Sequence, residues 1–403
     1  AASDVYKRQP MDSELNILLN SIKDKTGIDI TVYAESMKYV EYQNFQYTEN
    51  LKKATFNGNI DPTTSTSYGI FYNSSVEQVV LSDKMTTLSP NLFQNAKSLK
   101  IVTYNGYVPT DRSQFEEGLE NVLPPQINNV PYQLFSGCTS LRSMDLSNIT
   151  TYSVYSASSN YNAVFQNCTS LEKVTLNSTL NSLVGRMFSG CTSLTSIDLP
   201  DTLTFLGKEK TFEKSGIISI EIPSGVKNFG TTETACAATS SVNLFDGCVS
   251  LETVILPSNL SDFKIGGYVF RGCTALETIK CGKDGVANKL DGVTLVGQYA
   301  FSGSAIKTLN LPDVDSVGTY AFGVKSNDYT KGNYVSGLES VSLPKLNTFG
   351  TYMFSYCKEL TSVTLGDDAE ALANYMFDGC SALSTLTLPS KLKFLGTYTF
   401  RNS

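Results

Sequence analysis

Nine cysteines are the residues of this sequence that most invite a chemical role. Seven of them stand three residues after a phenylalanine, and serine or alanine takes the same place elsewhere, as at Ser215 and Ala96. A position that accepts all three residue types requires a small side chain, and free cysteine behaves as a small buried hydrophobe. We therefore predict an inward row of reduced thiols at Cys138, Cys168, Cys191, Cys248, Cys273, Cys357 and Cys380. Cys281 is predicted to be buried too, whereas Cys236 lies in a loop and is the thiol expected to react.

Catalytic chemistry finds little support in the residue types. The sequence contains no histidine, which excludes Ser–His and Cys–His nucleophile pairs and histidine-based metal sites. Zinc sites use close cysteine pairs or histidine partners, and neither is present. Carboxylates such as Asp145, Asp198 and Glu221 are scattered, and there is no phosphate-binding loop or dinucleotide fingerprint. We predict a protein that is not an enzyme and that uses no cofactor.

Tyrosine forms the most distinctive set. It stands two residues before six consecutive phenylalanines of the C-terminal half, at Tyr268, Tyr299, Tyr320, Tyr352, Tyr375 and Tyr398. A glycine usually precedes this position and a buried phenylalanine follows it, so the side chain is expected to face outward. If neighbouring copies stack about 5 Å apart, the rings form a stripe. Such a row suits protein binding, and a self-stacking ladder that shields the turn is the other interpretation.

These residues keep their register because one unit recurs along the chain. Its clearest copy is Phe188-Ser-Gly-Cys191-Thr-Ser-Leu194-Thr-Ser-Ile197-Asp-Leu199-Pro200. The phenylalanine recurs at Phe45, Phe71, Phe93, Phe135, Phe165, Phe188, Phe212, Phe245, Phe270, Phe301, Phe322, Phe354, Phe377 and Phe400. A fixed period of this length is typical of repeat proteins.

The repeat predicts a fold directly. Its second half alternates apolar and polar residues, as in Val174/Leu176, Ile197/Leu199, Val254/Leu256 and Leu386/Leu388, which is the pattern of a strand with one buried face. A proline often follows, where a missing N–H group ends a strand. One short strand cannot bury its apolar face alone, but stacked copies can. We predict a repeat solenoid with a parallel sheet on one side and turns with short 3₁₀ or helical pieces on the other.

The unit resembles the BspA-type leucine-rich repeat of bacterial and protozoan surface proteins. The resemblance rests on Phe-x-x-Cys-x-x-Leu-x-x-Ile-x-Leu-Pro and on Gly-x-x-Ala-Phe, as in Val317-Gly318-Thr319-Tyr320-Ala321-Phe322, and it covers residues 45–403. It implies a leucine-rich repeat fold and an extracellular or cell-surface location. It also implies adhesion through a protein ligand, such as a host extracellular matrix protein.

Three segments are expected from the N-terminus onward. Residues 1–9 are interpreted as a non-native, adapter-derived segment, and residues 10–44 as a cap made of a helix and a strand. Residues 45–403 are the repeat array, which we expect to be truncated at its C-terminal end. Polar insertions interrupt the repeat and are expected to be loops along one edge; they lie at residues 104–131, 150–163, 231–243, 282–296 and 323–336.

Composition narrows the function classes. The 403 residues carry a net charge of −7 with no basic run, which disfavours nucleic acid as a partner. No apolar stretch reaches the length of a membrane-spanning helix, so no membrane insertion is expected. We therefore predict a protein-binding module, with a passive spacer or stalk as the alternative. Rows of outward Ser and Thr, such as Ser362/Thr364 and Thr385/Thr387, leave a carbohydrate-binding sheet surface as a further alternative.

Overall fold

The computed structural model describes residues 51–56, 69–153, 162–232, 236–332 and 334–403. The expected N-terminal segments, residues 1–9 and 10–44, and the first anchor Phe45 lie outside the described residues. The chain divides into two compact units. The first contains residues 1–180 and 184–198, and the second contains residues 181–183 and 199–403.

The first unit is built from short parallel strands. One sheet contains β1 (Lys53–Thr55), β2 (Gln78–Leu81) and β3 (Ile101–Tyr104), and another pairs β5 (Ser143–Leu146) with β7 (Lys173–Leu176). A further pair is β4 (Asn129–Val130) with β6 (Thr151–Tyr152), and helix α2 (Arg112–Glu116) lies in an insertion. Each strand pairs with its equivalent in a neighbouring coil, as the repeat predicts.

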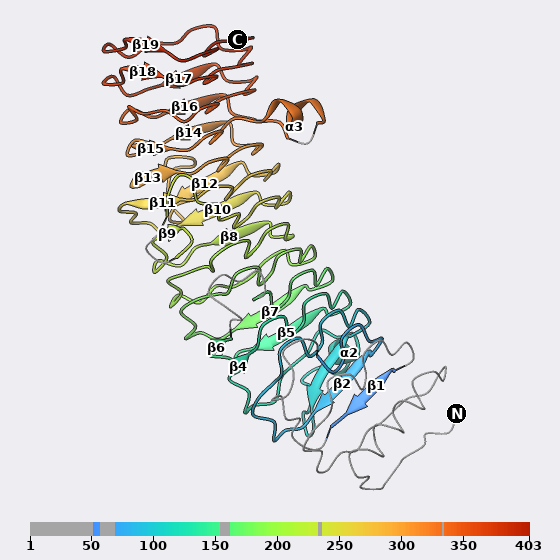
Figure 1. Cartoon of the computed structure of the whole chain (residues 1–403). Coiled ribbons are helices and arrows are strands. Elements are labelled where there is room, and N and C mark those ends of the chain that lie inside the picture. The colour runs from blue at the N-terminus through green and yellow to red at the C-terminus, as the bar shows by residue number, and fades with distance from the viewer. Residues whose placement is uncertain (1–50, 57–68, 154–161, 233–235, 333) are drawn as a thin grey trace. The chain divides into compact units, whose positions relative to one another are not determined.

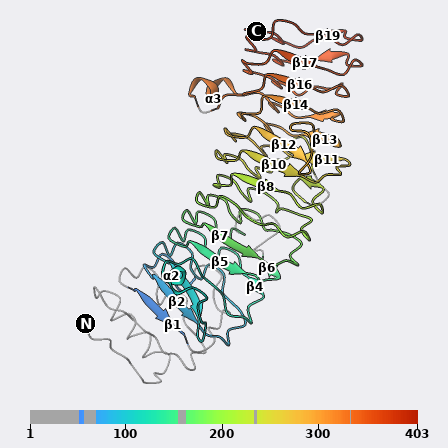
Figure 2. The ribbon, with the colours of Figure 1, turned by 180° about the vertical axis from the view of Figure 1, so that it is seen from behind.

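The second unit has two ladders of parallel strands, each made of two separate sheets (Figures 1 and 2). The first ladder contains β8 (Ser219–Glu221), β10 (Thr253–Leu256) and β12 (Thr278–Cys281), then β14 (Thr308–Asn310), β16 (Ser340–Ser342) and β17 (Ser362–Thr364). The second contains β9 (Asn228–Phe229), β11 (Phe263–Ile265), β13 (Val293–Val296) and β15 (Ser316–Val317), then β18 (Ala371–Leu372) and β19 (Phe394–Leu395). Helix α3 (Ser326–Thr330) lies in an insertion.

The return leg differs in detail from the expectation. The parallel sheet and the turns are confirmed, but short strands take the place of the 3₁₀ or helical pieces in the described coils. Glycine permits this pairing, because a Cβ atom on Gly266 would lie 2.3 Å from the carbonyl oxygen of Phe229 in the neighbouring coil. The Gly266 N–H group instead donates to that oxygen at 2.9 Å. Close approach of two backbones thus produces a strand where a helix was expected.

Three predicted segments are not as expected. Residues 195–200 and 382–389 are not strands, because they do not make the ladder hydrogen bonds of their neighbours, and Leu388 is exposed. The last four residues of the insertion at residues 282–296 form strand β13, which pairs with β11 and β15. The apolar residues of Val293–Val296 are buried, and this local alternation was overlooked in a segment interpreted as a loop.

Stacked phenylalanine rings form the core of each unit. They run from Phe71 to Phe188 in the first unit and from Phe212 to Phe400 in the second, with ring centroids 5.4 to 5.8 Å apart. The leucine six residues after the anchor is also buried, as at Leu194 and Leu251. The predicted inward register is therefore confirmed at these positions.

The seven cysteines in register are buried and reduced, as predicted. Each thiol also donates to the carbonyl oxygen of the phenylalanine in the preceding coil, with sulfur–oxygen distances of 2.9 to 3.3 Å. The Phe135 oxygen, for example, accepts from the Cys138 N–H group of its own turn and from the Cys168 thiol of the next coil. The thiol, a weak donor, thereby links consecutive coils. This second role was not predicted from the small-residue pattern.

The other two cysteines differ from the expectations. Cys281 is half-buried rather than part of the core, because the insertion after β12 leaves its side chain at a pocket wall. Cys236 is half-buried as well, and its thiol lies 3.4 Å from the carbonyl oxygen of Phe229. Burial raises the pKa of Cys236 to about 11. Since the thiolate is the reactive form, this thiol is less reactive at neutral pH than its loop position indicated.

The Leu194→Ala substitution should lower the free energy of unfolding by about 2–5 kcal/mol, because it leaves a cavity in a packed core. Leu194 is fully buried, whereas Ser196 in the same coil is exposed. Chemical denaturation of Leu194→Ala and of the control Ser196→Ala should therefore show a large loss only for the first. Equal losses in the two variants would contradict the inward register.

Thiol labelling should depend steeply on pH in a Cys281→Ser variant, where Cys236 is the remaining half-buried cysteine. Because the pKa of Cys236 is about 11, the labelling rate should rise about tenfold per pH unit between pH 7 and pH 10. A Cys236→Ser control should lose this phase. The seven buried thiols should label only in denaturant, and their rapid labelling in the folded protein would overturn the assignment.

Candidate functional site: a tyrosine stripe and a flanking loop

The six tyrosines form one continuous stack along the second unit. Neighbouring ring centroids lie 4.5 to 5.2 Å apart, with interplanar angles of 3° to 27°. Each tyrosine lies at a corner of its coil, two residues before its stacked phenylalanine, and all but Tyr352 follow a second-ladder strand, as Tyr268 does after β11. The predicted stripe is thus confirmed as a geometric feature, and we call Tyr268, Tyr299, Tyr320, Tyr352, Tyr375 and Tyr398 the tyrosine stripe.

The backbone at this corner is left-handed. All six tyrosines have φ between 54° and 61°, a region that costs an ordinary residue of the order of 1 kcal/mol or more. The N–H group of each of the first five donates to the next coil, as Tyr320 does to the Thr351 oxygen at 3.1 Å. Coils without tyrosine use the same conformation, with φ of 57° at Asn91 and 55° at Asn243. The repeat therefore determines the backbone conformation at this corner, whereas the side chain there differs from coil to coil.

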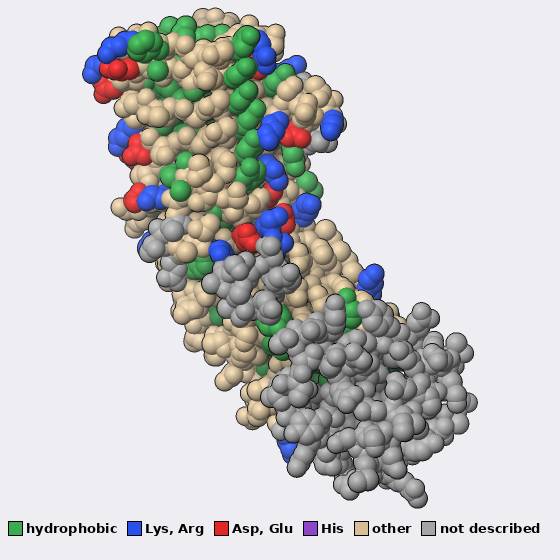
Figure 3. All heavy atoms as spheres, viewed as in Figure 1, with side chains coloured by type: hydrophobic (Ala, Val, Ile, Leu, Met, Phe, Trp, Pro, Cys, Tyr) green, Lys and Arg blue, Asp and Glu red, His purple; other side chains and the backbone are tan. Residues whose placement is uncertain are grey.

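Stacking covers the faces of the rings, and five of the six side chains remain at least partly exposed. Inner rings of the stack have a tyrosine on each face, as Tyr352 has Tyr320 at 4.6 Å and Tyr375 at 4.5 Å. Exposure varies along the row, because Tyr398 is 56% exposed whereas Tyr299 is only 8% exposed. The outward expectation is thus wrong for Tyr299, whose ring is covered by its two neighbours and by Lys325. Figure 3 shows a band of hydrophobic side chains crossing these coils, with basic side chains beside it.

Two ion pairs with buried aspartates hold arginines against the tyrosine stripe. Asp246 accepts from Arg271 at 2.5 and 2.8 Å, and the Arg271 guanidinium lies 4.7 Å from the Tyr268 ring centroid. Asp378 makes the same two bonds with Arg401, at 2.5 and 2.9 Å. Arg401 lies 5.1 Å from the Tyr375 centroid. Both carboxylates are buried whereas both guanidinium groups are partly exposed, so the charge that faces solvent is positive.

The insertion at residues 323–336 flanks the stripe. Its Lys325 ammonium lies 5.1 Å from the Tyr299 centroid, and a hydrogen bond with that tyrosine raises the pKa of Lys325. The Tyr334 side chain packs against Gly272 and Gly303, where an added Cβ would lie 2.4 and 2.7 Å from it. These contacts fasten the loop to two successive coils, those of Phe270 and Phe301. The segment around α3 lies alongside the hydrophobic band (Figures 1 and 3).

Three phenols of the stripe, those of Tyr268, Tyr320 and Tyr352, have a raised pKa and are neutral at physiological pH. Burial is the first cause that raises the pKa of Tyr268, Tyr320 and Tyr352, and the neighbouring tyrosines raise it further. A neutral phenol can donate a hydrogen bond as well as accept one. The stripe therefore presents a row of donors and acceptors between apolar ring edges.

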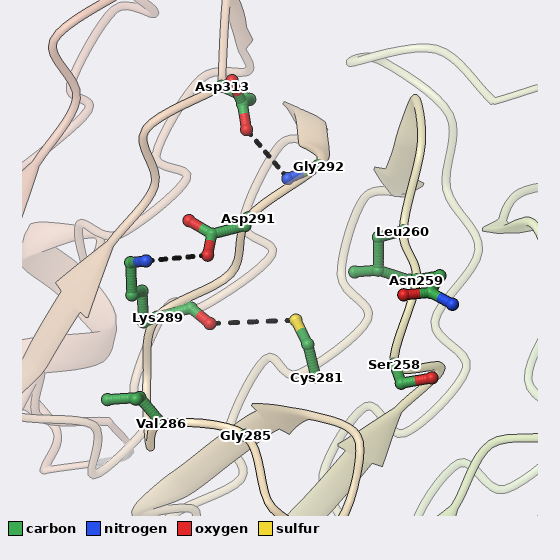
Figure 4. A pocket seen from close by; sticks show the side chains of 10 residues that line it. All are labelled: Ser258, Asn259, Leu260, Cys281, Gly285, Val286, Lys289, Asp291, Gly292 and Asp313. Carbon is green, nitrogen blue, oxygen red and sulfur yellow. Dashed lines mark hydrogen bonds and ion pairs between the residues drawn. The ribbon is translucent and has the colours of Figure 1, made fainter.

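A pocket of about 470 Å³ lies beside the end of β12 (Figure 4). Lys289 and Asp291 point toward one another across 2.8 Å, and the Gly292 N–H group donates to Asp313 at 2.9 Å. Asp313 also pairs with Lys345 at 2.6 Å. Because its charged groups already pair within the protein, this pocket is a weaker candidate for ligand binding than the stripe.

The flanking groups were missed by the sequence reasoning. Arg271 and Arg401 each follow their phenylalanine directly, one coil after an aspartate in the same register, at Asp246 and Asp378. That one-coil offset is a signal from which the pairs could have been found. The sequence contains no comparable pattern from which the packing of Tyr334 against Gly272 and Gly303 could have been predicted. In the described part of the chain, no group of three or more cysteine and acidic side chains could hold a metal ion.

The polar strand face is outward in the C-terminal coils, as predicted, whereas Ser143 of β5, also expected to face outward, is buried. Ser362 and Thr364 of β17 are exposed on either side of buried Val363, and Thr385 and Thr387 are exposed in the next coil.

Over the ranges that the structure describes, no helix has the length and apolar character needed to span a membrane.

Comparison with known proteins gives a family and several similar structures. The sequence matches the family described as "BspA type Leucine rich repeat region (6 copies)" in five segments, at residues 23–116, 70–161, 115–235, 238–331 and 332–403. No curated protein matches the chain.

The chain is also similar to several solved structures at low identity. A leucine-rich repeat protein from Bacteroides ovatus ATCC 8483 is 24% identical over 70% of this chain and 72% of the other, with a TM-score of 0.49. A leucine rich cell surface protein from Faecalibacterium prausnitzii A2-165 is 18% identical over 92% of this chain and 90% of the other, with a TM-score of 0.46. The pneumococcal vaccine antigen PcpA is 15% identical over 86% and 80%, with a TM-score of 0.42.

The family match spans most of the sequence and coincides with the coils described above. The repeating phenylalanine, cysteine and leucine positions that define those coils are the residues on which the resemblance rests. The chain therefore belongs to the BspA-type leucine-rich repeat family.

Proposed function

We propose that this protein is an extracellular or cell-surface binding module that recognises a protein through the tyrosine stripe. The observation that carries the proposal is the stack of six tyrosines held in a left-handed backbone, five of which are at least partly exposed. Adhesion to host or neighbouring-cell proteins, including extracellular matrix proteins, is the role that the family resemblance adds to this proposal.

The stripe has the properties of a protein-binding surface. Tyrosine and arginine are enriched among residues that dominate binding energy, and both occur here, with Arg271 and Arg401 beside the rings. The stacked rings have little freedom left to lose, so a partner pays a small entropic cost for ordering them. An alternation of apolar edges and hydroxyl groups matches the mixed character of a polypeptide surface.

Two alternatives make different demands on the same surface. A sugar ring packs its C–H groups against the open face of an aromatic ring, and the inner tyrosines have both faces occupied. A carbohydrate ligand would therefore use the outward Ser and Thr of the strand face, such as Ser362 and Thr364. A passive spacer would need neither surface. The unit's ordered rings and paired arginines favour the protein ligand over both.

Replacing three tyrosines by asparagine should abolish binding without unfolding the coils. We suggest Tyr320→Asn, Tyr352→Asn and Tyr375→Asn, because Asn91 and Asn243 hold the same left-handed position in other coils. The full chain and this triple variant would be tested for saturable binding to immobilised extracellular matrix proteins and glycans. We expect binding of the full chain to a matrix protein and a loss of at least about tenfold in affinity for the variant.

Three serines or threonines from the same coils provide the matched control. Ser340→Ala, Ser362→Ala and Thr385→Ala change the strand face and should leave matrix binding unchanged. Glycan binding that is lost in this control, and retained in the tyrosine variant, would establish the carbohydrate alternative. Absence of any saturable binding by the full chain would favour the spacer.

A further inference from the structure

The repeat register identifies the residues that were added next to the tyrosine stripe. Coil 301–312 runs Phe301, Ser304, Ile306, Leu309, Leu311 and Pro312 without interruption. The following coil has Phe322 and Val324, then resumes at Ser336, Leu338, Val341, Leu343 and Pro344. Ser336 occupies the small-residue position, since its hydroxyl lies 3.5 Å from the Cys357 thiol. Residues 325–335 are therefore a complete insertion, and removing them restores the repeat.

This insertion is fastened to the stripe side of the unit at both ends. Lys325 reaches the Tyr299 ring at its start, and Tyr334 packs on Gly272 and Gly303 near its end. Between them, the Ser326 hydroxyl lies 3.1 Å from the Tyr356 hydroxyl. Tyr299, the ring that Lys325 contacts, is also the least exposed of the six. The loop thus occupies one part of the surface that the proposed function assigns to a partner.

We propose that the insertion is an intramolecular ligand, and that the partner protein presents the same chemistry to the open part of the stripe. That chemistry is a lysine or arginine at a phenol, followed after a short turn by an aromatic side chain. The inference rests on the proposed function and names the class of partner: a basic segment that carries an exposed tyrosine.

The phenol row supports this match. Lys325 shows that an ammonium group can contact a ring whose two faces are occupied, because it also forms a hydrogen bond with the Tyr299 side chain. Tyr320, Tyr352 and Tyr375 stack in the same way, and their side chains are partly exposed. A cation that contacts such a ring gains both the hydrogen bond and the electrostatic attraction of the aromatic system.

A deletion and a synthetic peptide test the proposal directly. The variant lacking residues 325–335 uncovers Tyr299, Gly272 and Gly303, and a peptide of residues 324–335 is the probe. Fluorescence anisotropy should show saturable binding of the labelled peptide to the deletion variant. The full chain should bind it at least about tenfold more weakly, because its own loop competes at a high effective concentration.

Peptide variants show which contacts carry the binding. A peptide with Lys325→Ser and Tyr334→Ser should lose binding, whereas Lys331→Ser, which changes an exposed lysine of the same loop, should leave it unchanged. No binding to a folded deletion variant, or equal binding to the full chain and the variant, would overturn the proposal. The matrix-binding result for the tyrosine triple variant is independent of this outcome, so the two proposals fail separately.

Limited proteolysis provides a second measurement if the deletion variant does not fold. In the full chain, Lys325→Ser with Tyr334→Ser should release the loop and speed tryptic cleavage after Lys331 by at least about fivefold. Circular dichroism would confirm that the coils remain folded. An unchanged cleavage rate would show that these two contacts do not fasten the loop and would overturn the proposal.

Discussion

The spacing between hydrogen-bonded coils is the constraint on which the rest of this structure depends. Neighbouring strands in a sheet lie about 4.7–4.9 Å apart, and every side chain in register must fit that distance. Inside each unit, the phenylalanine rings of neighbouring coils have centroids 5.4 to 5.8 Å apart. At the corner of the second unit, the tyrosine ring centroids are 4.5 to 5.2 Å apart, so both rows fit the strand spacing. Aromatic rings can stack at this spacing, which is why both positions tolerate one residue type in coil after coil.

The repeat made much of the fold predictable, and the exceptions have physical reasons. Phe188, Leu194 and Cys191 are buried as expected, because each depends only on its place in the unit. Ile197 and Leu199 share the same pattern but are half-buried and form no strand, since a strand also requires a hydrogen-bonded neighbour. Periodicity reports which face a residue prefers. It does not report whether a partner strand is present.

The candidate site was predictable only in part for a related reason. The tyrosine stripe follows from register alone, and its stacking confirms that reasoning. Lys325 and Tyr334, in contrast, belong to an insertion whose path depends on tertiary contacts with Tyr299, Gly272 and Gly303. Those glycines leave room for a ring because they carry no side chain. This packing surface for Tyr334 can be recognised only when the coils that carry the two glycines are placed side by side.

The left-handed corner has a consequence for how this protein can vary. Asparagine, glutamine, arginine, lysine and tyrosine all occupy it with nearly the same φ, as at Asn91, Gln133, Arg186, Lys210 and Tyr268. A single substitution can therefore add a ring to the row, or remove one, without moving the main chain. The tyrosine row can therefore lengthen or shorten in steps of one coil. The length of the surface that contacts another molecule would change by the same steps.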